Sequence, residues 1–208
     1  SYEGLTAALG HATAEVKGSL AAATGTTQIS VVDAGGFMVS MTTTNGAGGG
    51  VLIPGTGIHL NNMLGEDDLL PDGLDAVTPG ERLRSMSAPT ILLAPDGTAT
   101  ALGSGGSARI RSAIATVIVR LRDGGESLPE AIAAPRAHLE DSGVVQVEHG
   151  LSAESLAQLR QHFDVNVWDC TDFYFGGVNA VQRTPDGQVT AVADHRRNGS
   201  VAIVPAAG

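Results

Sequence analysis

Two hairpin signatures constrain the fold of this chain more than any other feature. The β-rich segments Thr27–Asp33 and Phe37–Thr44 flank Ala34-Gly35-Gly36, and Pro89–Leu93 and Thr98–Gly103 flank Pro95-Asp96-Gly97. Short turns of this composition connect antiparallel neighbours, whereas parallel strands need a long crossover connection. The sequence therefore predicts a single α+β domain built on mainly antiparallel sheets.

The rest of the chain alternates helical periodicity with short β-rich runs. Apolar spacings of three and four predict helices at Thr6–Ala23, Ser107–Arg122, Leu128–Ala134 and Ala153–His162. Ser107 is the expected N-cap of the second helix, because a serine side chain can accept a hydrogen bond from the first turn. Further strands are expected at Val144–Val147, Val165–Val167, Val178–Arg183 and Val189–Ala193, and residues 45–88 are expected to form loops.

Composition narrows the classes of function. The net charge of −10 argues against binding to nucleic acid or to acidic membranes, because both require basic patches. The single cysteine, Cys170, excludes an internal disulfide framework and any cysteine-rich metal site. No run approaches the roughly 18 apolar residues that a membrane-spanning helix needs.

The histidines and arginines form no recognisable binding motif. His59, His138 and His195 are scattered without an HExxH spacing, so we interpret them as structural or surface residues. Neither a metal ion nor an organic cofactor is predicted. The chain is acidic, so the arginines outside any motif are expected to form ion pairs or to face solvent, namely Arg82, Arg84, Arg109 and Arg111.

The first β-rich segment is preceded by Gly25-Thr26, and this pair has two interpretations. In the simpler one, Thr26 is a β-branched residue that begins a strand. In the other, the Gly25–Thr26 bond is cut, and the freed α-amine, with a pKa of roughly 7.7–8.0, accepts the proton of its own side-chain hydroxyl. Glycine favours the strained turn that such a cleavage needs, because it has no Cβ.

The segment Gly103-Ser104-Gly105-Gly106-Ser107 lies between an expected strand and the most regular of the expected helices. Backbone N–H groups at a helix N-terminus are unpaired and can stabilise a developing negative charge. Gly105 and Gly106 are therefore candidate oxyanion-hole donors for acyl transfer. A phosphate-binding loop and a plain glycine turn are the alternatives, although the Lys-Ser/Thr of a P-loop is missing.

Thr44 and Asn45 close the first expected hairpin, and Thr44 comes 18 residues after Thr26. The hairpin would return both residues to the neighbourhood of Thr26. There a hydroxyl could orient the nucleophile, and an amide could hold a polar group of the substrate. Threonines are also common in strands, so a purely structural role is the alternative.

Several sequence blocks follow one another in a characteristic order along the chain. Thr26-Thr27-Gln28-Ile29-Ser30-Val31-Val32-Asp33 is followed by Val39–Asn45, Gly55–Asn62, Arg82–Thr90, Gly103–Ile110 and Ala133–His138. This order resembles the catalytic small subunit of the gamma-glutamyltransferase family, which cuts itself before a threonine in the context Thr-Thr-His-x-Ser-Val-Val-Asp. The resemblance runs from about Gly25 to the final strands.

The resemblance implies a role for each matching residue. Thr26 would be the self-processing site and the nucleophile that takes the acyl group. Thr44 would hydrogen-bond this nucleophile, and Asn45 would contact the α-amino group of the acyl donor. Gly105 and Gly106 match the oxyanion-hole glycines. The fold implied is the αββα sandwich of N-terminal nucleophile hydrolases.

The resemblance also implies a division of the chain and a partner. Residues 1–25 would be the helical end of a large-subunit-like portion, and residues 26–208 would be the small-subunit-like catalytic domain. A larger N-terminal portion of the same precursor would supply the rest of the sandwich and an arginine for the donor carboxylate. Without it the chain would lack a complete substrate pocket. The sequence leaves open whether homo- or hetero-oligomers form.

The substrate-binding positions depart from the family pattern. Gln28 stands where many members have histidine, and Met63 stands where a Gln or Glu often holds the substrate ammonium. The acid that would accompany it depends on where an insertion is placed, and the choices are Glu66, Asp67 and Asp68.

The family's serine pair for the substrate α-carboxylate is reduced to Ser85, because Arg84 replaces the other serine. Three functions therefore remain open. The leading one is gamma-glutamyl transfer or hydrolysis of glutathione-like gamma-glutamyl amides through a Thr26 acyl-enzyme. Met63 and Arg84 also fit a glutaryl-type cephalosporin acylase on the same scaffold. The third is an unprocessed, non-catalytic fragment or binding scaffold.

Overall fold

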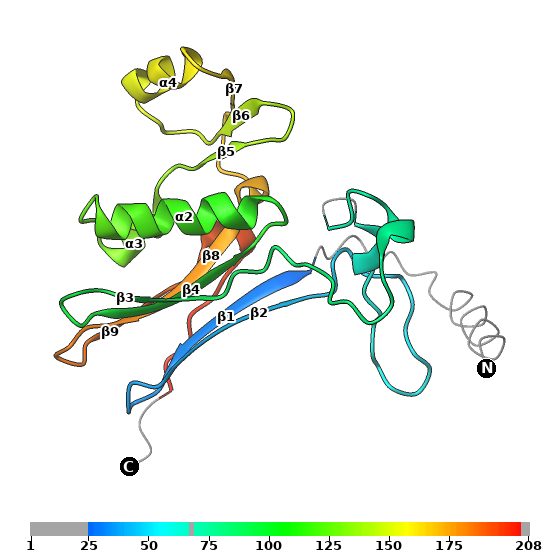
Figure 1. Ribbon diagram of the computed structural model, residues 1–208. Helices are drawn as coiled ribbons and strands as arrows, with labels where there is room; N and C mark the ends of the chain where they lie inside the picture. The colour runs from blue at the N-terminus through cyan, green and yellow to red at the C-terminus, as the bar shows by residue number, and fades with distance from the viewer. Residues whose placement is uncertain (1–24, 67–68, 205–208) are drawn as a thin grey trace. The chain divides into compact units, whose positions relative to one another are not determined.

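The computed structural model describes residues 25–66 and 69–204 (Figure 1). The helix expected at Thr6–Ala23 lies outside the described residues, as do Asp67 and Asp68. The described chain forms two compact units. Among the described residues, the first unit comprises 25–27, 43–66 and 69–85, and the second unit comprises 28–42 and 86–204.

The described residues contain nine strands and three helices. The strands are β1 (Thr26–Val32), β2 (Met38–Thr44), β3 (Thr90–Leu93), β4 (Ala99–Gly105), β5 (Ala137–Leu139), β6 (Val144–Val147), β7 (Asp164–Val167), β8 (Gly177–Arg183) and β9 (Val189–Val192). The helices are α2 (Arg109–Arg122), α3 (Leu128–Ala133) and α4 (Ala153–Arg160). Short 3-10 turns occur at Met63–Gly65, Leu74–Ala76, Phe173–Phe175 and His195–Arg197. Among the strands, β5 was not expected from the sequence, because three residues are too few to show an alternating pattern.

The strands form three sheets, with the orders β1-β2, β3-β4-β8-β9 and β5-β6-β7. All pairs of the four-stranded sheet are antiparallel, whereas β6 and β7 pair in parallel. Helix α4 lies between these two strands in the chain, as the crossover of a parallel pair requires. The expectation of an α+β fold with mainly antiparallel sheets is confirmed.

Both expected hairpin turns are present. In the first, the Asp33 N–H donates to the Phe37 carbonyl at 3.0 Å, and the Phe37 N–H donates to the Asp33 carboxylate at 2.8 Å. Gly36 has a φ of 89° and Gly97, in the second turn, a φ of 90°. A residue with a Cβ would be strained at either position, which explains why the turns contain glycine.

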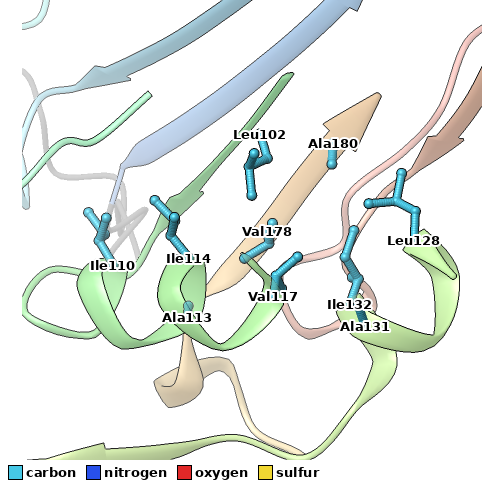
Figure 2. Close-up of a cluster of buried hydrophobic side chains, with 10 residues drawn as sticks. All are labelled: Leu102, Ile110, Ala113, Ile114, Val117, Leu128, Ala131, Ile132, Val178 and Ala180. Carbon is cyan, nitrogen blue, oxygen red and sulfur yellow. The ribbon is translucent and has the colours of Figure 1, made fainter. Parts of the chain in front are cut away.

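A hydrophobic core lies between the four-stranded sheet and helices α2 and α3 (Figure 2). The α2 residues recur at helical spacing and point one way, as an amphipathic helix requires. Figure 2 shows the side chains that meet here, namely Ile110, Ala113, Ile114 and Val117 of α2, Leu128, Ala131 and Ile132 of α3, and Leu102, Val178 and Ala180 of the sheet.

The start of α2 differs from the expectation. Its N-cap is Ala108, which makes no side-chain cap, and Ser107 has a left-handed φ of 52°. Ser107 was therefore the wrong prediction, because the helix begins one residue later, after an alanine whose side chain cannot accept a capping hydrogen bond. Helix α3, by contrast, begins with a capping box in which the Ser127 N–H donates to the Glu130 carboxylate at 2.9 Å.

Residues 28–42 pack on the opposite face of the four-stranded sheet through polar contacts. The Ser30 hydroxyl donates to the Asn179 carbonyl at 2.9 Å, and the Ser40 hydroxyl donates to the Leu102 carbonyl at 2.8 Å. The second unit thus has a helical layer, a sheet, and the β1–β2 ribbon as a third layer. No helix of the described residues is long and apolar enough to cross a membrane.

Candidate active site

Thr26 begins β1 and Thr44 ends β2, and the hairpin brings their side chains together in the first unit. The Thr26 hydroxyl donates a hydrogen bond to Thr44 Oγ1 at 3.0 Å. Thr44 Oγ1 also accepts a hydrogen bond from the Gly46 N–H at 2.9 Å. Because the Gly46 backbone fixes the acceptor, the Thr26 hydroxyl is held in one orientation.

The peptide that precedes Thr26 is also held by this hairpin. The Gly25 N–H donates to the Gly46 carbonyl at 3.0 Å, and the Asn45 N–H donates to the Gly25 carbonyl at 3.4 Å. The carbonyl of the expected cleavage site therefore faces a backbone donor. Such a donor polarises a carbonyl and would stabilise negative charge developing on its oxygen.

Gly46 gives the neighbouring polar side chains room to approach this hairpin. A Cβ on Gly46, whose φ is 63°, would collide with the Glu66 carboxylate and the Asn62 side-chain oxygen. Asn62 is fixed in turn, because its Oδ1 accepts from the Ala47 N–H at 2.8 Å. Of the candidate acids, Glu66 is thus placed beside the residues that follow Thr44. The glycine-rich segment 46–50, Gly-Ala-Gly-Gly-Gly, was the sequence signal for a close approach.

The other predicted binding residues of this unit are less enclosed. Asn45 and Ser85 are both exposed. Asn45 contributes backbone groups, since its carbonyl accepts from the Gly48 N–H at 2.9 Å and from the Asn62 N–H at 3.3 Å. Asp67 lies outside the described residues.

Gly105 and Gly106 belong to the second unit, where β4 runs further than expected. Gly105 is still paired with Gly177 of β8, so Gly106, Ser107 and Ala108 form the turn into α2. Gly106 has a φ of 136°, and a Cβ on it would lie 2.9 Å from the Cα of Gly176. Glycine is therefore required at position 106 by close backbone packing.

Ser104 fixes the end of β4 through two hydrogen bonds. It is fully buried, its hydroxyl donates to the Gly105 carbonyl at 2.8 Å, and it accepts from the Gly177 N–H at 3.1 Å. These bonds make the Gly105–Gly106 segment rigid, which is the property that preorganised hydrogen-bond donors need.

A buried ionic network supports the segment on which Gly106 packs. Arg136 donates to the carbonyls of Phe175 and Gly176 at 3.1 and 3.2 Å, and to the Asp194 carboxylate at 2.5 Å. Arg196 donates to Asp194 at 3.2 Å and to Glu148 at 2.6 Å.

The charges of this network stabilise one another. Burial raises the pKa of Asp194, but Arg136, two backbone N–H groups and Arg196 outweigh it, so the pKa lies below its usual value. The network was not found from the sequence, because its members are far apart in the chain. The sequence signal for Arg136 was its place in the Ala133–His138 block.

Gln28, which replaces the family histidine, is buried between the β1–β2 ribbon and the four-stranded sheet. Its amide donates to Ser40 Oγ at 2.9 Å and to Ser30 Oγ at 3.0 Å, and accepts from the Thr42 hydroxyl at 2.6 Å. The Gln28 amide packs against Gly103, which has no side chain to obstruct it. Gln28 therefore positions the strand that Thr26 begins.

The histidines form no metal centre within the described residues, where no group of three or more His, Cys, Asp or Glu side chains could hold an ion. His138 Nδ1 lies 2.8 Å from Ser112 Oγ. Burial, followed by the charge of Arg109, lowers the pKa of His138.

Thr26 begins a strand, its hydroxyl is oriented by Thr44, and the chain has a layered α+β fold. These features define a candidate N-terminal nucleophile hydrolase. Residues 6–204 match the family described as gamma-glutamyltranspeptidase. The chain belongs to the gamma-glutamyltranspeptidase family, and the resemblance read from the sequence blocks is confirmed.

Two curated relatives illustrate the range of the family. The chain is 38% identical over 180 residues to the acylase ACY 1 proenzyme of Pseudomonas sp. (strain SE83), covering 84% of this chain and 31% of the relative. It is 32% identical over 181 residues to the glutathione hydrolase proenzyme of Bacillus subtilis (strain 168), covering 84% and 30%. The chain thus spans about a third of the length of these relatives.

Solved structures agree on the fold. The transpeptidase CapD of Bacillus anthracis is 30% identical with a TM-score of 0.68, covering 86% of this chain and 99% of that chain. The cephalosporin acylase of Bacillus halodurans is 26% identical with a TM-score of 0.67, covering 84% and 33%. The expected fold class is confirmed, whereas the roles of individual site residues stay predictions.

Proposed function

We propose that the protein containing this chain is a threonine-nucleophile enzyme that transfers or hydrolyses gamma-glutamyl groups of glutathione-like amides after cutting itself between Gly25 and Thr26. The observation that carries the proposal is the hydrogen bond from the Thr26 hydroxyl to Thr44, next to a Gly25 carbonyl that accepts from the Asn45 N–H. This cleavage would separate residues 1–25, attached to whatever precedes them, from the catalytic residues 26–208.

We expect the self-cleavage to use this geometry. Thr26 Oγ1 attacks the Gly25 carbonyl carbon, the C–N bond breaks, and the hydroxyl proton passes to the nitrogen, which becomes the free α-amine. Water then hydrolyses the Gly25–Thr26 ester, leaving a Gly25 carboxylate and a free Thr26 hydroxyl. Thr44 orients the attacking oxygen, and the Asn45 N–H stabilises the charge on the Gly25 oxygen.

The catalytic cycle uses the same hydroxyl with a new base. The α-amine of Thr26 accepts the hydroxyl proton as the oxygen attacks the donor amide, and that proton then leaves with the departing amine. Gly105 and Gly106 donate their N–H groups to the oxyanion. Glu66 and Asn45 hold the donor ammonium, with Asp67 as a further candidate, and Ser85 binds its carboxylate. Water or an amine acceptor then releases the acyl group.

A glutaryl-type acylase is the second candidate function. The 38% identity to an acylase proenzyme favours it, together with Met63 and Arg84 at positions where the family holds the substrate's ammonium and carboxylate. Rates on a gamma-glutamyl anilide and on its glutaryl analogue separate the two functions, because only the first has an α-amino group. A preference for the glutaryl compound selects the acylase.

The self-cleavage is tested by the intact mass of the denatured protein, expressed from its complete gene. Wild type and Thr27→Ala should yield a fragment that starts at residue 26, and Thr26→Ala should remain uncut. Thr27 is exposed beside the nucleophile, so its substitution is the matched control. A folded wild-type protein that stays uncut refutes the proposal.

We infer further that the preceding portion of the precursor packs on the outer face of the β1–β2 ribbon. Along the middle of both strands the polar residues Gln28, Ser30, Ser40 and Thr42 lie on the side of the four-stranded sheet. The apolar residues Ile29, Val31, Val39 and Met41 are between 41 and 49% exposed. An apolar face of this kind is typical of an interface. The relatives are proenzymes about three times as long as the chain, so this occupant is available in the same gene product.

Substitutions that place charged side chains on this face test whether the preceding portion packs there. Ile29→Glu combined with Met41→Glu should prevent the two portions from copurifying after cleavage. Val119→Glu is the control, because Val119 is 54% exposed on α2. Copurification of the double variant at the wild-type ratio would rule out this interface.

A further inference from the structure

Arg197 lies half-buried beside the glycine segment of the second unit. Its aliphatic stem covers the bare face of Gly177, where an added Cβ would lie 2.8 Å from Arg197 Cδ. Its Nη2 is 3.6 Å from the position of a Cβ on Gly106, and its Cζ is 3.6 Å from the centre of the Phe173 ring. The guanidinium is therefore held against Gly106.

A second arginine adds its charge to the same region. Arg109, in the first turn of α2, donates through Nε to the Tyr174 carbonyl at 3.3 Å, and its Cζ lies 4.6 Å from the centre of the Tyr174 ring. The adjacent rings of Phe173 and Tyr174 thus hold the two guanidinium groups. Burial, and then the like charge of Arg109, lower the pKa of Arg197 to about 10.

No carboxylate neutralises this pair within the described part of the chain, where neither arginine takes part in an ion pair. Arg197 Nε is also buried there without a hydrogen-bond partner. Asp194 attracts Arg197, but its oxygens already accept hydrogen bonds from Arg136 and Arg196.

This arrangement costs stability, since burying a charge without a partner is unfavourable. Uncompensated charges of this kind occur where a ligand supplies the missing partner. The sequence had indicated only surface or ion-pairing roles for Arg109, and Arg197 had not been singled out.

We propose that Arg197, supported by Arg109, binds a free carboxylate of a reactant next to Gly105 and Gly106. A guanidinium presents two parallel N–H donors that match the two oxygens of a carboxylate. The reaction concerned rests on the proposed function. Two reactants can carry the carboxylate, the acyl donor and an amino-acid or peptide acceptor. The site makes Arg197 a determinant of specificity for carboxylate-bearing reactants.

The test compares reactants that differ only in the carboxylate. The protein is expressed from its complete gene as wild type, Arg197→Gln, Arg197→Lys and Arg111→Gln. Arg111 is exposed and also lies in the first turn of α2, so its substitution removes the same charge without touching the site. The donors are glutaryl and butyryl anilides, and the acceptors are glycylglycine and its amide.

Arg197→Gln should lower kcat/KM for the glutaryl donor roughly 10- to 150-fold, the effect of losing a hydrogen bond to a charged group. The butyryl anilide should react as with wild type, Arg197→Lys should recover part of the loss, and Arg111→Gln should be unchanged. If donor rates are equal but transfer to glycylglycine falls relative to its amide, the acceptor supplies the carboxylate. The proposal is overturned if Arg197→Gln keeps both the wild-type preference for the glutaryl over the butyryl donor and the wild-type preference for glycylglycine over its amide.

Binding of glutarate, measured by calorimetry, separates this site from the proposed chemistry. Thr26→Ala protein should bind glutarate as wild type does, because binding needs no nucleophile, and Arg197→Gln should not. An unchanged thermal midpoint of Arg197→Gln shows that the variant is folded. If this variant binds glutarate as tightly as wild type, the site is refuted even where acyl transfer is observed. If wild type binds glutarate but transfers no acyl group, the proposed function fails and the site stands.

Discussion

Gly103→Ala is expected to destabilise the second unit through a side chain rather than through the backbone. Gly103 is not among the residues with a positive φ, so alanine can adopt its conformation. Its Cβ would instead lie 2.8 Å from Gln28 Nε2, and closer still to the rest of that amide. Gln28 is 4% exposed and is enclosed by its partners, so it cannot move aside without breaking hydrogen bonds.

The magnitude follows from the bonds at stake. The Gln28 amide is bonded to Ser40, Ser30 and Thr42 at 2.9, 3.0 and 2.6 Å. Each bond contributes about 0.5–1.5 kcal/mol net, so losing them should lower the free energy of unfolding by about 2–4 kcal/mol. Both serines also bond carbonyls of the four-stranded sheet, so the disturbance reaches the contact between the layers.

Urea unfolding, followed through the fluorescence of Trp168, the single tryptophan of the chain, measures this effect. Gln28→Ala removes the obstacle, so Gly103→Ala should cost less than about 1 kcal/mol in that background. Gly65→Ala is the control, since an added Cβ there meets nothing within 4 Å. The reasoning is refuted if Gly103→Ala unfolds like wild type, or if its cost is the same in both backgrounds.

Three further predictions concern the site and its support. Thr44→Val keeps the side-chain shape but removes the acceptor of the nucleophile's hydrogen bond, so self-cleavage should slow by roughly 10- to 100-fold in a gel time course; cleavage at the wild-type rate would count against this role. Asp194→Asn leaves Arg136 buried without its anion and should cost about 3–5 kcal/mol in urea unfolding. Because the pKa of Asp194 is lowered in the folded state, its stabilisation is complete above the usual aspartate value of about 3.9 and is lost as the pH falls below it, so the variant should lack this acid-induced loss. Burial, and then the hydrogen bond to Glu140, raise the pKa of Tyr174 to about 12, so an ultraviolet titration should show a late phenol step that Tyr174→Phe abolishes.

Elements whose contacts are local could be predicted from the sequence. Both hairpins follow from turn residues beside alternating strands, and the core face of α2 follows from helical spacing. The pairing of Thr26 with Thr44 was predictable for the same reason, because one hairpin joins them. Ser107 was mispredicted as a cap, since a left-handed turn imposed by the packing of Gly106 took the place of a capped helix start.

Contacts between distant segments could not be predicted from the sequence, because they are set by the packing of the folded chain. The network of Arg136 with Asp194, and the meeting of Arg109 with Arg197, join residues separated by most of a domain, so no spacing in the sequence signals them. Whether an arginine faces solvent or is buried against a ring depends on the packing of several elements at once. Local patterns specify backbone conformation, whereas the environment of a buried charge exists only after the elements have packed together.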